Sequence, residues 1–176
     1  MKVMNLRLMQ VIVFLMALGI GLLYVRLSKG LTSYHSVRQP LEFNHYLHVH
    51  EKELSCDDCH QSVKTGYHAS IPTLETCAAC HSEPQGSSAN EKAFVDQFAK
   101  TGMPLNWQRF FVLPEHAFFS HRIHVVRAEI KCQECHGPMD MQKQPPDRAL
   151  KVLTMEDCMR CHRERNAALD CNGCHR

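Results

Sequence analysis

The longest apolar stretch of the chain lies near its start, where residues 8–25 read LMQVIVFLMALGIGLLYV without a charge. Lys2 and Arg7 precede this stretch, and Arg26 and Lys29 follow it. A membrane-spanning helix needs about 20 apolar residues, whereas the apolar part of a signal peptide usually has about 7–15. No small-residue cleavage site follows, so the pattern predicts an N-terminal transmembrane anchor in residues 1–29. A cleaved signal peptide is the alternative.

Beyond residue 29 the apolar positions come in short runs, and one of these runs has helical spacing. Residues 90–102 read NEKAFVDQFAKTG, in which Phe94 and Phe98 share one helix face at i and i+4. Asn90 is the predicted N-cap of this short helix, and Gly102 is suited to its end.

Composition changes the picture, because cysteine and histidine are far more frequent than usual. The 176 residues include 10 cysteines and 13 histidines, and the formal net charge is +2. Without the four cations that flank the apolar stretch, residues 30–176 hold 16 basic and 18 acidic side chains. This balance argues against a nucleic-acid partner, which would require a clustered basic face.

Every cysteine belongs to a Cys-x-x-Cys-His motif. This spacing is the attachment signature of c-type haem: the two thiols add to one porphyrin, and the adjacent imidazole is the proximal iron ligand. The sequence therefore predicts five haem c groups. The motifs are motif 1 (Cys56, Cys59, His60), motif 2 (Cys77, Cys80, His81), motif 3 (Cys132, Cys135, His136), motif 4 (Cys158, Cys161, His162) and motif 5 (Cys171, Cys174, His175).

Zinc and disulfide chemistry explain these motifs less well. Structural zinc takes four ligands, usually from two Cys-x-x-Cys pairs, and five pairs do not divide into such sites. Disulfides or redox-active cysteine pairs give no reason for a histidine after every second cysteine.

The number of haems predicts the architecture of residues 30–176. About 29 residues per haem are too few to enclose each porphyrin in its own pocket, so the haems must supply much of the apolar core. We expect a multihaem cytochrome c fold, with loops and short α-helices wrapped round a haem stack and almost no sheet.

A His-x-x-His pair occurs twice at the same distance from a motif. His45 and His48 stand 11 and 8 residues before Cys56, and His121 and His124 stand 11 and 8 residues before Cys132. The repetition predicts two similar haem-binding units, at about 41–83 and 115–163, followed by a short tail with the fifth haem. Residues three apart on a helical turn face the same side, so one pair can serve two neighbouring irons.

We therefore expect His45 and His48 to be the distal ligands of the first and second haems, and His121 and His124 those of the third and fourth. The fifth distal ligand has three candidates, with His68 preferred over His116 and His116 over Met155. A methionine ligand would raise the reduction potential of its haem. His35 and His50 are expected to be solvated.

Several segments together resemble the membrane-anchored pentahaem subunit of alternative complex III, a relative of the class III multihaem cytochromes. They are PLEFNHYLHVHEKELSCDDCH, HASIPTLETCAACH, NWQRFFVLPEHAFFSHRIHV, CQECHGPM and LTMEDCMRCHR, and they extend over about residues 40–175. The family pattern has glycine where Glu156 stands here, which weakens the case for Met155 as a ligand.

The resemblance implies a class III-like fold and an electron-carrier subunit that is not itself an enzyme. It implies that residues 30–176 lie on the periplasmic side of the cytoplasmic membrane, anchored by a single helix. The implied partners are an integral-membrane quinol-oxidising subunit, an iron–sulfur/molybdopterin-like subunit, and a downstream cytochrome c or oxidase of a respiratory or photosynthetic chain.

Other functions are weighed against this one. A nitrite-type reductase would need a haem without a distal ligand, and such enzymes often have lysine in place of one motif histidine; here all five motifs end in histidine. A self-sufficient quinol dehydrogenase would carry its first motif soon after the anchor, whereas about thirty residues intervene here. A carrier subunit of another membrane redox complex and a purely structural haem protein are further alternatives.

Overall fold

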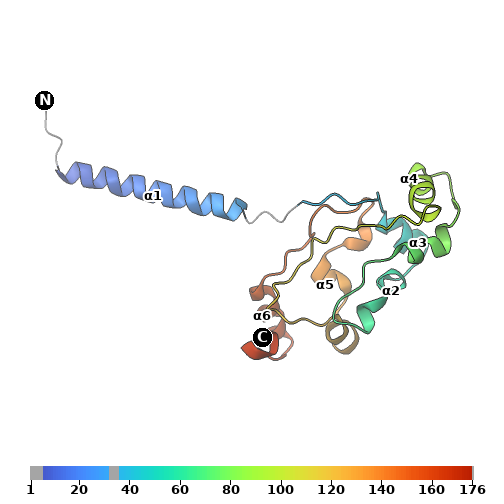
Figure 1. The fold of residues 1–176 in the computed structure, drawn as a ribbon. Coiled ribbons are helices and arrows are strands. Elements are labelled where there is room, and N and C mark those ends of the chain that lie inside the picture. The colour runs from blue at the N-terminus through green and yellow to red at the C-terminus, as the bar shows by residue number, and fades with distance from the viewer. Residues whose placement is uncertain (1–5, 32–35, 176) are drawn as a thin grey trace. The chain divides into compact units, whose positions relative to one another are not determined.

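The computed structural model of the chain describes residues 6–31 and 36–175 (Figure 1). Contacts within the chain divide it into two units, one ending at Ser36 and the other beginning at Val37. The sequence predicted the division between residues 29 and 30, at the end of the apolar stretch. The helix continues through the polar residues that follow this stretch, which moves the division towards the C-terminus.

The first unit contains one helix, α1 (Leu6–Leu31). Its segment Met9–Arg26 has a mean hydropathy of 2.0, and none of this segment is buried by the rest of the protein. The helix is long and apolar enough to cross a membrane, and a signal sequence near an N-terminus can meet the same criterion.

The second unit is built from short helices, and the two cysteines of each motif lie in one of them. Polar side chains begin several of these helices: Ser55 with Asp58, and Thr154 with Asp157, form capping boxes, and Asp170 accepts from Gly173 N. The helices that carry motifs 1 to 5 are, in that order, α2 (Cys56–Cys59), α3 (Leu74–His81), α5 (Cys132–His136), α6 (Met155–Glu164) and α7 (Cys171–Cys174).

The remaining helical segments are single turns or short extensions. Three are π-helical, η1 (Leu47–Glu51), η3 (Val95–Ala99) and η4 (Ile123–Arg127). Two are 3₁₀-helical, η2 (Gln61–Lys64) and η5 (Met139–Met141).

The helix predicted at residues 90–102 exists but begins earlier. Helix α4 (Ala89–Phe94) starts after Ser88, whose hydroxyl accepts from Glu91 N at 3.5 Å, and η3 continues it. The predicted cap at Asn90 is therefore wrong, because the serine two residues earlier takes that role. The predicted end is correct, since Gly102 has a φ of 70°.

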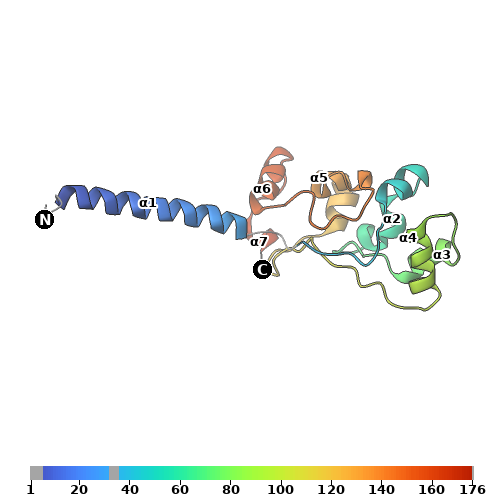
Figure 2. The same ribbon diagram turned by 90° about the horizontal axis from the view of Figure 1, so that it is seen from above.

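The motif-bearing helices follow one another along the second unit in a spatial order that differs from their chain order. In both views, α3 and α4 lie at one end, α6 and α7 lie at the other, and α2 and α5 lie between them (Figures 1 and 2). Extended segments connect these helices and run beside one another. Val37 N donates to Asp147 O at 2.8 Å, and Tyr46 N donates to Gln142 O at 3.0 Å.

The described residues have few buried side chains and little sheet. The buried apolar side chains are Val63, Phe94 and Val95. Outside the helices, one isolated antiparallel bridge joins Ala117 to His175. A domain of this length ordinarily has a larger core of its own, so the second unit does not owe its fold to packing between its own apolar side chains.

Candidate haem-binding site

The two predicted His-x-x-His segments have closely matching structures. Phe43 lies edge-on to His45, with ring centroids 4.8 Å apart, and is stacked on His48 at 4.4 Å. Phe119 lies edge-on to His121 at 4.9 Å and is stacked on His124 at 4.4 Å. One phenyl ring therefore holds both imidazoles of each pair in a fixed mutual orientation.

The backbone around these segments is also repeated. His48 Nδ1 lies 2.8 Å from Asn44 O, and His124 Nδ1 lies 2.8 Å from Ser120 O. Each π-helical turn then leads to a glutamate with positive φ, 56° at Glu53 and 52° at Glu129. The wider π turn, rather than the α turn that the spacing suggested, therefore carries the second histidine of each pair.

Four pairs of imidazoles face each other at the distance expected for two ligands of one iron. Metal–imidazole bonds are about 2 Å long, so two imidazoles on opposite sides of one iron have ring centroids about 6 Å apart. The centroid distances are 6.1 Å for His48–His81, 6.2 Å for His121–His136, 6.1 Å for His124–His162 and 5.4 Å for His116–His175. Each pair joins a motif histidine to a histidine outside the motifs.

His45 and His60 form the remaining association, at motif 1. Burial first, and then the neighbouring His60 and His48, lower the pKa of His45 to about 4, against an opposing effect of Asp140. Burial likewise lowers the pKa values of His121 and His136. These imidazoles are therefore neutral near pH 7, which is the form that binds a metal.

The Nδ1 atoms of two motif histidines, His60 and His162, lie against backbone carbonyl oxygens, which can only accept. His60 Nδ1 is 2.6 Å from Ser70 O, and His162 Nδ1 is 2.7 Å from Ala168 O. Since a carbonyl oxygen cannot donate, Nδ1 must carry the proton, which leaves the lone pair of Nε2 available for a metal. Among the distal candidates, His48 and His124 have the same arrangement, described above.

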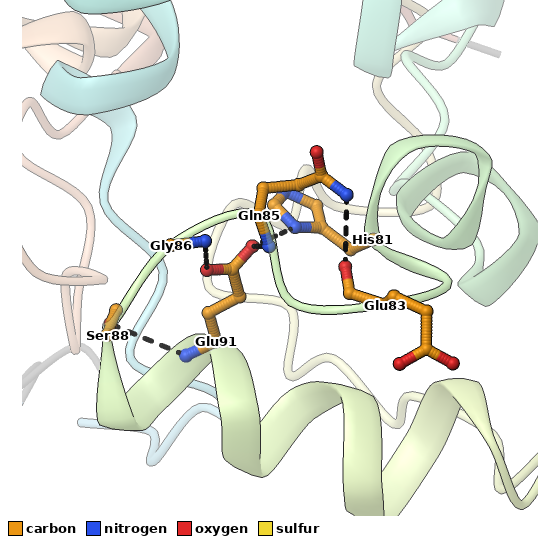
Figure 3. Close-up of polar contacts among 6 residues, drawn as sticks. All are labelled: His81, Glu83, Gln85, Gly86, Ser88 and Glu91. Atoms are coloured by element: carbon orange, nitrogen blue, oxygen red, sulfur yellow. Dashed lines mark hydrogen bonds and ion pairs between the residues drawn. The ribbon is translucent and has the colours of Figure 1, made fainter.

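His81 has a different partner, the carboxylate of Glu91 at 2.7 Å (Figure 3). The same carboxylate accepts from Gln85 N at 2.8 Å and from Gly86 N at 3.0 Å. Donation by Gln85 N is the main cause that lowers the pKa of Glu91, so the side chain is an anion near neutral pH.

The cysteines of different motifs lie close to one another in a definite order. The side chain of Cys132 interacts with that of Cys56 and raises its pKa, so motifs 1 and 3 are adjacent. Burial first, and then the nearby Cys59, raise the pKa of Cys77 to about 11, so motifs 1 and 2 are neighbours.

The same relation links the later motifs. Burial raises the pKa of Cys135, and the nearby Cys161 and Cys158 raise it further, so motifs 3 and 4 are neighbours. Burial and then Asp157 raise the pKa of Cys158, with a further contribution from Cys174, which makes motifs 4 and 5 neighbours.

A hollow of about 500 Å³ lies between motifs 1 and 2. Its lining includes one cysteine from each motif, Cys59 and Cys80, together with Leu54, Thr73 and Ala79. None of the ten cysteines, all of which lie within the described residues, forms a disulfide. Paired thiols, neutral imidazoles with an available Nε2, and facing imidazole pairs fit a bis-histidine c-type haem.

The other candidates for the fifth ligand are not brought to His175. His68 lies near His121, whose pKa it helps to lower after burial, and Met155 is 64% exposed at the first residue of α6. His50 is exposed, as expected, and its Nε2 atom lies 3.4 Å from Asp140 Oδ2. His35 lies outside the described residues.

Sequence reasoning did not identify Glu91 or the backbone carbonyls that bind the Nδ1 atoms. Ser88 and Glu91 form a Ser-x-x-Glu sequence, which ordinarily indicates a helix cap in which the glutamate turns back to the cap residue. Here the glutamate binds the preceding loop and His81 instead, and nothing in the spacing distinguishes the two outcomes.

Comparison with known proteins identifies the kind of chain. The profile of the family "Cytochrome c7 and related cytochrome c" matches residues 41–96 and 117–176. The first match contains motifs 1 and 2, and the second contains motifs 3 to 5. The chain is also 28% identical over 150 residues, 76% of this chain and 71% of the relative, to the multiheme cytochrome c subunit of menaquinone reductase from Nitratidesulfovibrio vulgaris (strain Hildenborough).

Proposed function

Because this chain belongs to the family of cytochrome c7 and related cytochromes c, we propose that it carries electrons through five haems in a membrane-anchored, quinone-linked redox complex. The family establishes the coarser part: the chain is a multihaem cytochrome c that binds haem covalently and serves electron transfer. The number of haems, the complex and its location are the proposed part.

The observation that carries the proposal is the set of facing imidazole pairs. We assign the axial pairs His45–His60, His48–His81, His121–His136, His124–His162 and His116–His175 to sites 1 to 5, numbered by motif. When bound, haem supplies an iron that changes by one electron between the ferric and ferrous states. Two protein ligands per iron leave no coordination position for a substrate, which favours a carrier over an enzyme.

The neighbouring cysteines support a spatial order of sites 2, 1, 3, 4 and 5. The order agrees with the succession of α3, α2, α5, α6 and α7 in both views (Figures 1 and 2). The two His-x-x-His segments contribute to it, because each holds ligands for two consecutive sites. Electrons would therefore pass along an unbranched row whose ends are sites 2 and 5.

The proposed partner is a subunit that exchanges electrons with menaquinone. The named relative is a subunit of menaquinone reductase, which supports a menaquinone-linked complex, and α1 supports attachment to the membrane. Complexes of the alternative complex III type oxidise quinol instead. The two candidate complexes therefore differ in the direction of electron flow. The haem unit lies on the periplasmic side in this proposal.

Two measurements on the full-length holoprotein test the proposal. The mass and the pyridine haemochrome absorbance should give five haems per chain, and the ferric protein should be entirely low-spin. Fewer haems, or a high-spin ferric signal in the untreated protein, would contradict the assignment of five bis-histidine sites.

Extraction in mild detergent, followed by mass spectrometry of co-purifying chains, tests the partner. A membrane quinone-binding subunit should co-purify, and the complex should exchange electrons with a menaquinone analogue in one preferred direction. If the isolated chain oxidised a menaquinol analogue unaided, it would be a self-sufficient quinol dehydrogenase rather than a carrier subunit.

A further inference from the structure

The carboxylate of Glu91 is held in place by three donors that come from one short stretch of chain. It accepts from His81 Nδ1 at 2.7 Å, Gln85 N at 2.8 Å and Gly86 N at 3.0 Å (Figure 3). The two backbone donors bind both carboxylate oxygens, so the side chain has little freedom to turn away from His81. They also favour the anionic form.

The contact between Glu91 and His81 is largely withdrawn from solvent. The side chain of Glu91 is 14% exposed and that of His81 is 28% exposed. Phe94, itself buried, lies edge-on to the His81 ring with centroids 6.1 Å apart. Since screening by water is reduced there, a fixed negative charge at this position acts more strongly on the imidazole than one at the surface would.

Among the other assigned ligands, Nδ1 lies against a backbone carbonyl oxygen in His48, His60, His124 and His162. His121 Nδ1 lies between Tyr67 O at 2.9 Å and Ala69 N at 3.2 Å, and the buried Nδ1 of His45 has no hydrogen-bond partner. The closest counterpart of His81 is His162, the second motif histidine of the other repeated unit, whose Nδ1 is 2.7 Å from Ala168 O. The distal partner is equally distant in the two sites, with centroid separations of 6.1 Å. Sites 2 and 4 therefore differ in the charge of the atom that accepts the Nδ1 proton.

We propose that Glu91 is a positioning residue that lowers the reduction potential of site 2 below that of the equivalent site 4. This inference rests on the proposed function, because it requires a haem at motif 2 with His81 as its ligand. A carboxylate acceptor makes the imidazole a stronger electron donor than a carbonyl acceptor does, and so stabilises the ferric iron.

The redox step itself is simple. One electron enters the ferric haem and gives the ferrous haem, no covalent bond forms or breaks, and the proton remains on His81 Nδ1. Because site 2 lies at one end of the proposed row, a lowered potential there would favour the entry of electrons at that end.

The substitution Glu91→Gln tests this role in the full-length holoprotein. It keeps the shape of the side chain and removes its charge. Hydrogen bonds to charged acceptors are roughly twice as strong as those to neutral ones, so the ferric-to-ferrous ratio of one haem at fixed potential should fall about tenfold. This corresponds to an upward shift of about 59 mV in one of five one-electron waves in a potentiometric titration.

Glu83→Gln is the matched control, because it removes the same charge two residues beyond His81. The Glu83 carboxylate is 71% exposed and is 3.8 Å from Lys100 Nζ. We expect the control to leave all five waves in place. If both variants shifted the same wave equally, or if Glu91→Gln shifted none, the inference would be overturned.

A spectroscopic signature assigns the shifted wave to site 2. His48→Ala should abolish one low-spin ferric signal, and Glu91→Gln should change the g-values of that same signal. A change confined to a different haem would contradict the inference. If the Glu91→Gln protein does not assemble with its haems, Glu91→Asp replaces it, because aspartate keeps the charge but holds it farther from His81. This variant should shift the same wave upward by less than Glu91→Gln. An unshifted wave in the Glu91→Asp protein would also overturn the inference.

The haem count separates this failure from failure of the proposed function. If the wild-type protein holds five low-spin haems and Glu91→Gln leaves the potentials unchanged, only the role of Glu91 is lost. If motif 2 holds no haem in the wild type, both proposals fail.

Discussion

The two repeated units hold their imidazole pairs alike but support them differently. In both units a phenylalanine is edge-on to one histidine and stacked on the next, with centroid distances that agree within 0.1 Å. Beyond the pairs, His81 donates to Glu91 in the first unit and His162 donates to Ala168 O in the second. The repeated part of the sequence fixes the ligand geometry, whereas the segment that follows each unit sets the electrostatic surroundings.

The difference follows from what comes after motif 2 and motif 4. After His81 the chain makes a loop and enters α4, which brings Glu91 back onto the ring. After His162 only a short connection leads to motif 5, so a backbone carbonyl of that connection meets the ring instead. The same ligand pair can therefore operate at different potentials within one chain.

Removing a whole attachment site should have the largest effect and should distinguish the two units. The double substitutions Cys77→Ala with Cys80→Ala, and Cys158→Ala with Cys161→Ala, should each remove one haem, measured by intact mass. Loss of site 4 interrupts the row and should make reduction of site 5 slow and biphasic in stopped-flow absorbance. Loss of site 2 only shortens the row, so the remaining haems should be reduced in one fast phase; equal kinetics in the two variants would refute the proposed order.

Removing one distal ligand from each unit should have the next largest effect. His48→Ala and His124→Ala should each convert one haem in five from low-spin to high-spin, because the sixth position of that iron becomes open. Electron paramagnetic resonance of the ferric protein measures the converted fraction. His50→Ala is the control, since His50 is exposed and lies beside Asp140; a high-spin signal in the control would count against the assigned pairs.

The fifth site offers a contrast between two candidates rather than between two units. His116→Ala should produce one high-spin haem, because its ring lies 5.4 Å from that of His175, whereas His68→Ala should leave all five low-spin. The same spectra distinguish the two residues. The reverse result would return His68 to the role that the sequence favoured.

The smallest expected effect concerns the phenylalanines that orient the pairs. Aromatic pairs contribute about 0.5–1.5 kcal/mol, so Phe43→Leu and Phe119→Leu should each lower the free energy of unfolding by about 1 kcal/mol. Phe43 also lies edge-on to Trp107, the only tryptophan, with centroids 6.5 Å apart. Phe43→Leu should therefore be the more destabilising change in guanidinium unfolding; a larger effect of Phe119→Leu would show that the two environments are not as described.

The sequence predicted the features that depend on local spacing. The Cys-x-x-Cys-His motifs required a multihaem cytochrome c, and the family match confirms that class. The separation of eleven and eight residues picked out the histidines that the structure then holds in matching turns. These features depend on a few consecutive residues, so they can be recognised before the fold is known.

Features that depend on contacts between residues distant in the sequence could not be predicted in this way. His116 reaches His175 because Ala117 bridges to His175 and Phe118 N donates to Cys174 O, contacts that join distant parts of the sequence. His68 was preferred because it is nearer to a motif in sequence, which does not decide proximity in space. The contact of motif 1 with motif 3 is likewise invisible in the linear spacing.

The contact between Cys56 and Cys132 bears on how the two repeated units are joined. These two cysteines occupy equivalent positions in the two repeated units. The contact between them therefore joins the same surface of each unit, as the isologous interface of a two-fold symmetric dimer does. A chain of half this length, with one unit only, would present the same surface on both copies. In this chain both copies of that surface belong to one polypeptide, so the contact forms within the chain.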